Sequence, residues 1–453
     1  MKKIEAFLFI GIFLLLALAP AVGLLVFGPA PAAANEILAQ PPELTEPDGS
    51  FNASVLSDAA AYIRDRFWLR QELVTCNSAV EAEIFHESAS AKVILGREGW
   101  LFFAETLDDF VGRNRLSSRQ LWAAAHTLAL IREEAERHGV RLLFALVPNK
   151  NTVYPDYMPT WASQTTEPTN ADNLLAAMVA AEIPAVDLRP VMQAHREEAQ
   201  IYHTLDSHWN QLGAALAHNA ILAALDRPVP AWEPSAFRAA WNHQADLYQM
   251  LYPAGTKLDL QYEPDREWSF AYTRPIRSPE DQRIQTESET GTGALLMFRD
   301  SFGNTLHRFL AESFSTACFS RAMPYDLRLL DSEPADTLIL EIAERHLPWL
   351  AQRAPILLAP RRRFDCSEAQ SAEAISGNAL ASGGEWYGIG GKLPLAPDVD
   401  SPVWLVADGT VYEASPVGET PDSFAAYLLQ KPETLRVCWR SDGGLFAAPV
   451  TLP

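Results

Sequence analysis

The sequence predicts an α/β protein with a parallel sheet flanked by helices, followed by a small β-rich domain. Between residues 118 and 342, apolar runs of strand length alternate with segments whose apolar positions repeat at helical spacing. This alternation is typical of sheets with parallel strands. Beyond residue 393, short β-prone runs are separated by Asp-Gly and Gly-Gly turns, a pattern that indicates a small β-sandwich.

Local signals place the individual elements along the chain. Residues 50–90 favour amphipathic helix, and residues 92–103 favour a hairpin that turns at Arg97-Glu98-Gly99. Ser117 or Ser118 can cap a helix that Gly139 ends, and residues 140–147 form an apolar run typical of a buried parallel strand. The remaining expected elements are helices at 171–182, 211–225 and 302–313, and strands at 185–188, 294–298 and 337–342.

The first 30 residues have the composition of a transmembrane anchor or a signal segment. Residues 6–28 carry no charge, and a helix of about 20 apolar residues can cross the hydrocarbon core. Lys2 and Lys3 favour a cytoplasmic N-terminus, which predicts a single-pass inner-membrane protein with its main domain in the periplasm. Ala32-Ala33-Ala34 is a candidate cleavage site, and cleavage there would release the protein into the periplasm.

Composition argues against several classes of protein. The formal net charge of −21 disfavours binding to nucleic acid. The four cysteines, Cys76, Cys318, Cys366 and Cys438, lack the spacing of a zinc site, so we expect neither a metal nor a cofactor. One or two disulfides are compatible with an oxidising compartment, and three pairings stay open.

Two short motifs supply the residue types of a serine acyl-transfer site. Asp206-Ser207-His208 lies in one polar stretch, and Arg299-Asp300-Ser301-Phe302-Gly303 follows an apolar run. A serine hydroxyl needs an imidazole to accept its proton, and the imidazole needs a carboxylate to set its tautomer. A DxH triplet alone carries little information in a chain with ten histidines and 57 acidic residues. The candidate catalytic residues are therefore Ser301, His208 and Asp206, subject to their context.

The predicted sheet supplies that context. Ligands of parallel α/β sheets bind beyond the carboxyl ends of the strands. Asn149, the 206–208 turn, Ser301 and Glu344 each follow a strand end or could do so, so these segments can converge on one rim. Because Ser301 lies where a strand passes into a helix, the backbone N–H groups of Phe302 and Gly303 are candidate oxyanion donors.

The same motifs resemble the sequence blocks of SGNH hydrolases. The segment Asp206-x-His208-Trp209-Asn210 resembles the last block of that family, and Phe298-Arg299-Asp300-Ser301-Phe302 resembles the first block, which holds the nucleophile. The blocks stand in reverse order, so the chain resembles a circular permutation of the SGNH fold. Together with the 92–103 hairpin and Val147-Pro148-Asn149-Lys150, they resemble the SGNH-like O-acetyltransferases of alginate and exopolysaccharide biosynthesis, the AlgX/AlgJ type.

This resemblance implies a periplasm-facing O-acetyltransferase that moves acetyl groups onto hydroxyls of an exported polysaccharide. A multispanning membrane O-acyltransferase is the implied acetyl donor partner. Ser301 would be the nucleophile, His208 the general base and Asp206 the carboxylate that orients it. The alternatives are a carbohydrate O-acetylesterase and a non-catalytic glycan-binding scaffold subunit, and the negative charge mildly favours a neutral acceptor over alginate.

The chain departs from the family pattern at the oxyanion site. Glu344-Arg345 stands where the family has its oxyanion asparagine, and Arg299 replaces the glycine of the nucleophile block. The backbone amides after Ser301 are therefore the first choice of donor. Asn149 and Asn304 are the alternatives.

Residues 232–292 are polar and aromatic without regular periodicity, which indicates an irregular insertion that serves as a lid or binding loop. Exposed aromatic faces suit sugar rings, although the same aromatics could pin a long loop to the core. Trp209 could instead pack beneath the helix that follows it, and Lys150 could be a solvated loop residue. The candidate substrate-binding residues are Lys150, Trp209, Trp241, Tyr262 and Trp268.

The expected organisation has five segments along the chain. They are an anchor or signal at 1–30, a linker at 31–50, an SGNH-like acetyltransferase domain at 51–365, a linker at 366–392 and a β-rich domain at 393–453. Ser, Ala and Gly are frequent between residues 371 and 391, which predicts the second linker. The last domain has no diagnostic motif, so both glycan binding and simple packing against the main domain stay open.

Overall fold

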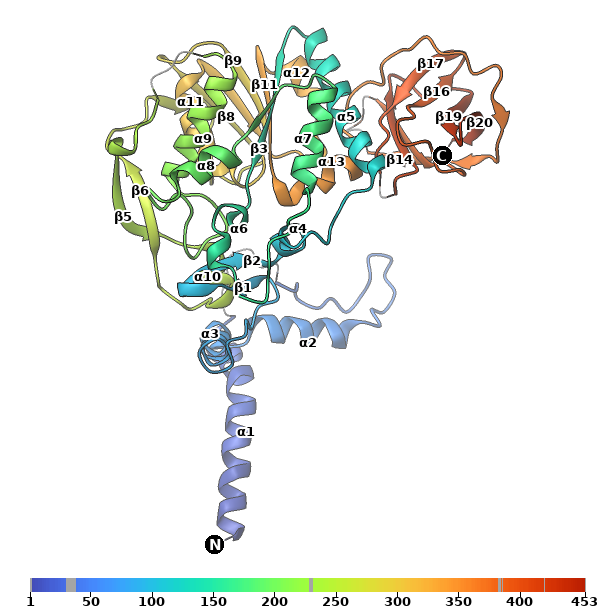
Figure 1. The fold of residues 1–453 in the computed structure, drawn as a ribbon. Helices are drawn as coiled ribbons and strands as arrows, with labels where there is room; N and C mark the ends of the chain where they lie inside the picture. Colours follow the sequence, from blue (N-terminus) through green and yellow to red (C-terminus); the bar gives the residue numbers. More distant parts are fainter. Residues whose placement is uncertain are drawn as a thin grey trace.

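The computed structural model describes residues 2–29, 38–227, 231–381, 384, 386–418 and 420–452. An N-terminal helix projects from the body of the molecule, an α/β domain forms most of that body, and a β domain lies at its side (Figure 1).

The α/β domain is built on a seven-stranded sheet. In sheet order its strands are β4 (Ala185–Asp187), β3 (Arg141–Val147), β11 (Thr337–Ala343), β9 (Ala294–Phe298), β10 (Thr316–Ser320), β8 (Arg283–Ser288) and β7 (Phe270–Tyr272). The strands from β4 to β10 run parallel, and β8 and β7 extend one edge antiparallel. β10 escapes the sequence pattern because its polar ends shorten the apolar run.

Helices cover both faces of this sheet. They are α5 (Ser118–Arg137), α7 (Asn170–Ala180), α8 (Arg189–His195), α9 (Gln211–Ala224), α11 (Gly303–Ser313) and α13 (Pro348–Gln352). Leu143 of β3 and Met297 of β9 pack on one face with α8, α9 and α11. Phe144 and Phe298 point to the opposite face and pack with α5, α7 and α13, as the two-residue period of a strand requires. The α/β class is confirmed, whereas the circular permutation stays a prediction.

Side-chain caps explain where these helices begin. Ser117 and Gln120 form a capping box at the start of α5, and Thr169 is part of the same motif at α7. The side chain of Asn210 accepts a hydrogen bond from the third residue of α9 at 3.1 Å. Gly139 follows α5 with a φ of +71°, a conformation that glycine adopts without strain and that ends the helix.

The region 232–292 is more regular than the sequence predicts. β5 (Phe237–His243) pairs antiparallel with β6 (Asp259–Pro264), α10 (Asp246–Leu251) lies between them in the chain, and β7 and β8 join the central sheet. The expected irregular insertion is therefore wrong. β5 has no buried residue, so no continuous apolar run marks it in the sequence.

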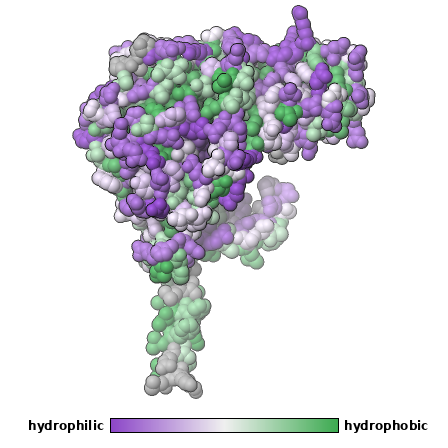
Figure 2. Space-filling model, viewed as in Figure 1, coloured by the Kyte–Doolittle hydropathy of each residue, from purple (hydrophilic) through white to green (hydrophobic). Residues whose placement is uncertain are grey.

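The N-terminal helix α1 (Lys2–Phe27) is the apolar element that the sequence predicts. Its segment Ala6–Phe27 is long and apolar enough to cross a membrane. Figure 2 shows it as an apolar stem below a largely polar body. The candidate cleavage site at 32–34 lies outside the described residues.

Two helices connect α1 to the body, namely α2 (Val55–Arg66) and α3 (Arg70–Val80). The turn between them contacts α1 through Trp68, whose ring stacks on Phe27 with centroids 5.0 Å apart. The Trp68 backbone N–H also donates to the Pro20 carbonyl at 3.2 Å. This hydrogen bond and the ring contact hold the turn against the C-terminal part of α1.

A hairpin of β1 (Val93–Leu95) and β2 (Leu101–Phe103) follows α3, and its turn contains Gly99 at a φ of +79°. The expected hairpin is confirmed. The other short helices are α4 (Leu107–Phe110), α6 (Lys150–Val153), α12 (Leu329–Ser332), a π-helical turn at Glu81–Phe85, and 3₁₀ turns at Arg97–Gly99, Ala104–Thr106, Pro155–Tyr157, Pro234–Ala236 and Glu344–His346.

The C-terminal domain consists of two facing sheets. The larger has the order β12-β20-β19-β16-β17 with β13 on β20, and the smaller has the order β14-β15-β18. Their strands are β12 (Gln370–Ser371), β13 (Ile375–Ser376), β14 (Asn378–Leu380), β15 (Tyr387–Lys392), β16 (Val403–Ala407), β17 (Thr410–Ala414), β18 (Ser423–Leu428), β19 (Leu435–Ser441) and β20 (Gly444–Thr451). Leu405, Trp439 and Val450 of the larger sheet pack against Ile389 and Phe424 of the smaller, which makes the domain a β-sandwich.

Strands β12 to β15 lie within 366–392, so the expected linker is wrong there. The glycines that favour a linker prediction serve close packing instead. A Cβ on Gly388 would come within 2.7 Å of the Leu380 carbonyl oxygen on the neighbouring strand, and only glycine permits that approach.

The sandwich packs against α5 of the main domain. The Arg119 guanidinium donates to the carbonyl of Ser401 at 2.7 Å and to two further carbonyls of the same loop. Arg362 forms an ion pair with Glu133 of α5 at 2.5 Å. Packing against the main domain is therefore a role of this domain, while glycan binding stays a prediction.

Candidate active site

Ser301 lies in the turn between β9 and α11, which Asp300 organises. One carboxylate oxygen of Asp300 accepts from the Phe302 N–H at 2.9 Å. The other accepts from the Ala343 N–H at 3.0 Å and from His346 Nδ1 at 2.8 Å. Burial opposes ionisation, but the bond from His346 and nearby positive charge hold the pKa of Asp300 well below its usual range. Asp300 therefore anchors the nucleophile turn to the end of β11.

The DxH triplet lies in a tight loop that precedes α9. A bridge between Tyr202 and Trp209 closes the loop, and the His203 N–H donates to the His208 carbonyl at 3.1 Å. The Trp209 indole N–H donates to the Phe302 carbonyl at 3.2 Å. This last bond ties the loop directly to the residue after Ser301.

The structure brings the two motifs together. His208 Nε2 lies 2.8 Å from Ser301 Oγ, and His208 Nδ1 lies 2.7 Å from an Asp206 carboxylate oxygen. The same carboxylate oxygen accepts from the His208 backbone N–H at 3.0 Å. Asp206 thus fixes the imidazole so that Nε2 faces the hydroxyl, which is the relation that a Ser/His/Asp relay requires.

The electrostatics of the site suit proton transfer. Burial disfavours the charged form of Asp206, but hydrogen bonds from His208 and His243 hold its pKa well below the usual range. Burial also opposes charge on His208, yet its bond to the Asp206 carboxylate raises its pKa above the usual value. An ionised Asp206 can therefore stabilise the imidazolium that forms when His208 takes a proton.

Two further residues, His243 and Asp246, form hydrogen bonds with Asp206, and the sequence motifs did not identify them. His243 Nε2 lies 3.0 Å from the second carboxylate oxygen of Asp206, which also accepts from the Asp246 backbone N–H at 2.8 Å. The Asp246 carboxylate in turn accepts from the Ser207 hydroxyl at 2.6 Å. His243 ends β5 and Asp246 begins α10, so neither has a fixed spacing from the DxH triplet that could identify it.

The ligand atoms of Asp206, His208 and Asp246 lie within 4.8 Å of one another, a spacing that could also hold a cation. The carboxylates already accept hydrogen bonds from the loop itself. The His208 Nδ1 atom faces Asp206 at 2.7 Å. The three side chains therefore satisfy one another as a hydrogen-bonded network.

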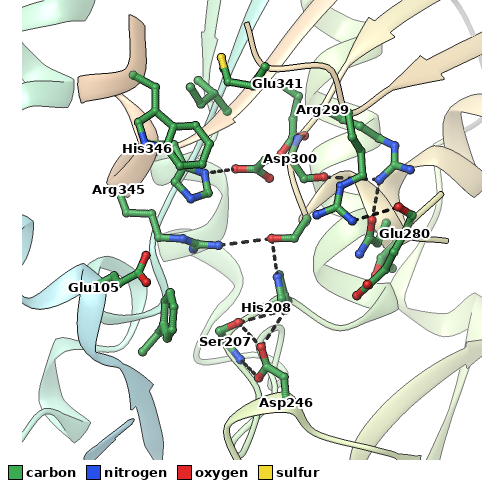
Figure 3. A pocket seen from close by; sticks show the side chains of 18 of the residues that line it. Glu105, Ser207, His208, Asp246, Glu280, Arg299, Asp300, Glu341, Arg345 and His346 are labelled. Atoms are coloured by element: carbon green, nitrogen blue, oxygen red, sulfur yellow. Dashed lines mark hydrogen bonds and ion pairs between the residues drawn. The ribbon is translucent and has the colours of Figure 1, made fainter. Parts of the chain in front are cut away.

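Arg345 and His208 point toward the Ser301 hydroxyl from different directions (Figure 3). Its Nη2 lies 3.4 Å from Ser301 Oγ, and its guanidinium lies over the Phe302 ring at 5.1 Å. Arg345 follows β11 in the 3₁₀ turn Glu344–His346. A guanidinium presents several N–H donors in a rigid planar group, so Arg345 is positioned to donate hydrogen bonds to an oxyanion at Ser301.

The other predicted oxyanion donors are placed elsewhere. The Asn149 side chain donates to Asp109 at 3.2 Å and its backbone N–H donates to Glu344 at 2.7 Å, so the expectation for Asn149 is wrong. The Phe302 N–H donates to Asp300, which removes it as a free donor. Gly303 opens α11, and its N–H stays a candidate.

Asn304 borders the cavity, but its side-chain oxygen accepts from Arg299 Nη1 at 2.5 Å. Arg299 also donates to the carbonyls of Pro279 and Asp281. Arg299 therefore ties the turn that holds Ser301 to the segment before β8.

Lys150 is neither a solvated residue nor a substrate contact, because its side chain is buried at 3% exposure. Its ammonium donates to the carbonyls of Leu101, Thr204 and Asp206 at 2.6 to 2.8 Å. Three acceptors match the three N–H donors of an ammonium. Lys150 thus joins the β1-β2 hairpin to the DxH loop, and the expectation of sugar binding is wrong.

Three predicted substrate-binding aromatics do not line the site. Trp241 is 68% exposed on β5 but does not border the cavity at Ser301. Tyr262 and Trp268 pack against the main core, where Trp268 contacts Phe309 with ring centroids 5.0 Å apart. Trp209 borders the cavity, yet it is 1% exposed and serves mainly as packing.

Ser301 opens into a cavity of about 1300 Å³. Phe103 of β2, Gln249 of α10, and Trp349 and Arg353 are among the residues that line it. The Trp349 ring stacks on His346 with centroids 3.9 Å apart, and the Arg353 guanidinium lies 4.4 Å from the same ring. The region 232–292 therefore contributes to the cavity through α10, the end of β5 and the segment before β8, and the sequence reasoning did not consider the aromatic lining residues Phe103 and Trp349.

The fold and this site define an α/β domain with a serine, a histidine and an aspartate at the strand ends, and comparison with known proteins finds similarity to SGNH-like domains. Residues 93–288 match a family described as "SGNH hydrolase-like domain, acetyltransferase AlgX". Over this segment, which is less than half of the chain, the protein is therefore similar to SGNH-like acetyltransferase domains of the AlgX type. The match includes Asp206 and His208 but ends before Ser301, so Ser301 is assigned to the site by its geometry.

The relatives with curated names are described as "Probable alginate O-acetylase AlgJ". The Pseudomonas putida protein is 27% identical over 150 residues, which cover 33% of this chain and 38% of that protein. The Pseudomonas syringae pv. tomato protein is 27% identical over 183 residues, which cover 40% and 45%. The chain thus matches less than half the length of these two relatives.

Solved structures with similar coordinates include the O-acetyltransferase domain of Pseudomonas putida AlgJ and Bacillus cereus PatB1. The AlgJ domain has a TM-score of 0.40 and 19% identity over 56% of this chain and 92% of that one. PatB1 has a TM-score of 0.43 and 16% identity over 56% and 96%.

Proposed function

We propose that this protein is an O-acetyltransferase that moves acetyl groups onto polysaccharide hydroxyls through an acetyl-serine intermediate. The observation that carries this proposal is the position of His208, hydrogen-bonded to Ser301 through Nε2 and to Asp206 through Nδ1. The matched family and the names of the curated relatives supply the acetyl group and the polysaccharide class.

In the first step His208 Nε2 takes the proton of Ser301 Oγ, and the oxygen attacks the carbonyl carbon of an acetyl donor. Negative charge develops on the former carbonyl oxygen, within reach of the Arg345 guanidinium. The intermediate collapses, the donor's leaving group departs with the proton held by His208, and acetyl-Ser301 remains. Asp206 stabilises the transient imidazolium.

In the second step a glycan hydroxyl occupies the place of the departed leaving group. His208 takes the hydroxyl proton, the alkoxide oxygen attacks the acetyl carbonyl, and Ser301 Oγ leaves and regains a proton from His208. Water can attack in the same way and would release acetate. A cavity of about 1300 Å³ is large enough for sugar units, which would displace water from acetyl-Ser301.

The acceptor that we propose is an exported polysaccharide. Alginate is the first candidate, because the curated relatives are named for it. A neutral glycan is the second, because the chain carries a net charge of −21 and would repel a polyanion at long range.

We further propose that α1 is a single membrane anchor with its N-terminus in the cytoplasm and the catalytic domain in the periplasm. Ala6–Phe27 has the required length and hydropathy, and Lys2 and Lys3 precede it. A multispanning membrane O-acyltransferase is the proposed source of acetyl groups, since an anchored acceptor domain would stay close to such a partner.

The test uses the full-length protein in detergent with a chromogenic acetyl ester. The wild type should release chromophore in a burst and carry one acetyl group on Ser301 by peptide mass spectrometry, and Ser301→Ala should do neither. Ser332→Ala, which changes an exposed serine at the end of α12, is the matched control. Equal turnover by the wild type and Ser301→Ala would reject the acetyl-serine mechanism.

Transferase and esterase activities are separated by adding acceptor oligosaccharides. Acetylated alginate or neutral oligosaccharide should appear at the expense of free acetate as acceptor concentration rises. Free acetate at an unchanged rate, with no acetylated sugar, would identify the protein as an esterase.

A further inference from the structure

The cysteines Cys366 and Cys438 lie on the outer face of the larger sheet in the C-terminal domain. Side chains of β19 alternate, so Val437 and Trp439 enter the core of the sandwich while Cys438 points to the opposite face. Cys438 is directly in register with Trp404 of β16 on one side and Ala447 of β20 on the other. These three side chains form a buried apolar row across the sheet.

The segment 360–372, which we call the crossing segment, lies over this row. It begins at the β17 edge, where the Arg362 N–H donates to the Val411 carbonyl at 2.9 Å. It ends at the opposite edge, where the Ala372 N–H donates to the Ala447 carbonyl at 2.8 Å and β12 pairs with β20. Hydrogen bonds at both edges therefore fix the position of the crossing segment.

Between these two edges the side chains of the crossing segment follow the strands in order. Phe364 stacks on Trp404 of β16, with ring centroids 3.6 Å apart and an angle of 5° between the rings. Cys366 comes two residues later and packs in the same cluster as Cys438 of β19. Burial, followed by a hydrogen bond with the Cys366 thiol, raises the pKa of the Cys438 thiol.

The other cysteines do not share this arrangement. Cys76 is exposed on α3 and Cys318 is buried in β10 of the α/β domain. Cys318 lies in the core between the central sheet and α5. Of the cysteine pairs that the chain allows, the structure thus brings Cys366 and Cys438 together and keeps Cys76 and Cys318 apart from them.

We infer that Cys366 and Cys438 form a disulfide in the mature protein, which locks the crossing segment onto the outer face of the sandwich. The inference rests on the proposed periplasmic placement, because disulfides form and persist in oxidising compartments. The oxidant is a disulfide-bonded thiol oxidase or a small-molecule disulfide. The Cys366 thiolate attacks one sulfur of that disulfide and releases the first oxidant thiol. Cys438 then loses its proton and its sulfur attacks the Cys366 sulfur of the mixed disulfide, which releases the second oxidant thiol, so two protein thiols are oxidised and the oxidant leaves as two thiols.

The disulfide would also secure the contact between the two domains. Arg362, four residues before Cys366, pairs with Glu133 of α5 at 2.5 Å and with Glu413 of β17. Holding the crossing segment in place keeps this arginine between the two domains. The disulfide is far from Ser301 in the fold, so its loss should leave the catalytic geometry intact.

The experiment maps thiols in the full-length protein taken from the membrane of an exporting host. The protein is denatured in iodoacetamide without reductant, digested, and analysed by mass spectrometry. We expect Cys76 and Cys318 to be alkylated and the peptides that hold Cys366 and Cys438 to be joined. In parallel, a membrane-impermeant maleimide is applied to spheroplasts, where exposed Cys76 reports which side of the membrane the domain occupies.

Alkylation of both Cys366 and Cys438 in protein whose Cys76 reacts in spheroplasts would overturn the inference while leaving the placement intact. Unreactive Cys76 would instead overturn the placement and, with it, the disulfide in the cell. Purified reduced protein titrated with glutathione disulfide tests the geometry alone, and failure to join the two cysteines there would also reject it.

Variants give an independent measurement. Cys366→Ser should lower the melting temperature of the purified oxidised protein by roughly 10 °C, because the bond closes a long loop of chain. Cys76→Ser should leave it unchanged, and both variants should retain turnover of the chromogenic ester. Equal melting temperatures for Cys366→Ser and Cys76→Ser would contradict the proposed lock.

Discussion

Replacing Arg345 with glutamine removes the guanidinium that faces Ser301 and leaves a shorter neutral amide. Arg345 Nη2 lies 3.4 Å from Ser301 Oγ, which is a long contact to the resting hydroxyl. It can shorten when the acetyl carbonyl oxygen gains negative charge, because a charged donor binds an oxyanion more strongly than a neutral oxygen. The interaction therefore belongs mainly to the transition state.

The surroundings of Arg345 keep its charge available. Aromatic rings of Phe302 and Phe103 lie 5.1 and 5.7 Å from the guanidinium. Among the described residues, its buried Nε has no hydrogen-bond partner. Loss of one oxyanion donor typically lowers kcat by about 10²–10³-fold, which corresponds to about 3–4 kcal/mol. We expect Arg345→Gln to show a loss of this size with little change in KM.

The assay is steady-state and burst kinetics with the chromogenic acetyl ester, and Arg353→Gln is the matched control. Arg353 borders the same cavity, but its guanidinium packs on Trp349. Arg345→Lys keeps the charge and should recover part of the loss, since it lacks the planar fork. If Arg345→Gln stays within about threefold of Arg353→Gln in kcat, Arg345 makes no transition-state contact and the assignment is wrong.

Three further changes test the surrounding network. His208 must be neutral to act as a base, and its pKa lies above the usual 6.5. The value of kcat/KM should therefore fall as the pH drops through a midpoint above 6.5. A pH–rate profile with a midpoint below 6.5 would contradict this expectation. His243→Leu removes a hydrogen-bond donor to Asp206 and should lower kcat/KM by roughly 10–100-fold. His243→Gln keeps a donor and should recover much of the lost kcat/KM. Equal kcat/KM in the two variants would show that this hydrogen bond does not contribute to turnover. Lys150→Met leaves three buried carbonyls without a donor. It should lower the free energy of unfolding, measured with denaturant, by about 3 kcal/mol or more. An unchanged unfolding midpoint would show that Lys150 does not stabilise the contact between the hairpin and the DxH loop.

Sequence patterns predicted the elements that carry the site because those signals are local. A buried parallel strand such as β3 is a continuous apolar run, and the caps Ser117 and Asn210 act within their own first turn. The region 232–292 was not predictable in the same way. Strands β5 and β7 have no buried residue, so burial does not impose a period on their side chains.

The candidate site residues could be predicted from the sequence where they lie together in one short motif. Asp206 and His208 are two residues apart in one loop, where the Asp206 carboxylate lies 2.7 Å from the His208 imidazole. The supporting residues come from other elements: His243 from β5, Asp246 from α10 and Arg345 from the turn after β11. Their distance in sequence from the motif is arbitrary, so only folding brings them to it.

By itself, the sequence determined the α/β class, the apolar N-terminal helix and the candidate triad, because periodicity, hydropathy and short motifs are properties of neighbouring residues. The tertiary structure decided which charges are available and which are consumed. It buried Lys150 beneath three carbonyls, directed Asn149 to Asp109 and placed Arg345 beside Ser301. A side chain's role in a site depends on its nearest polar partners, and these partners are chosen when distant strands and loops pack together.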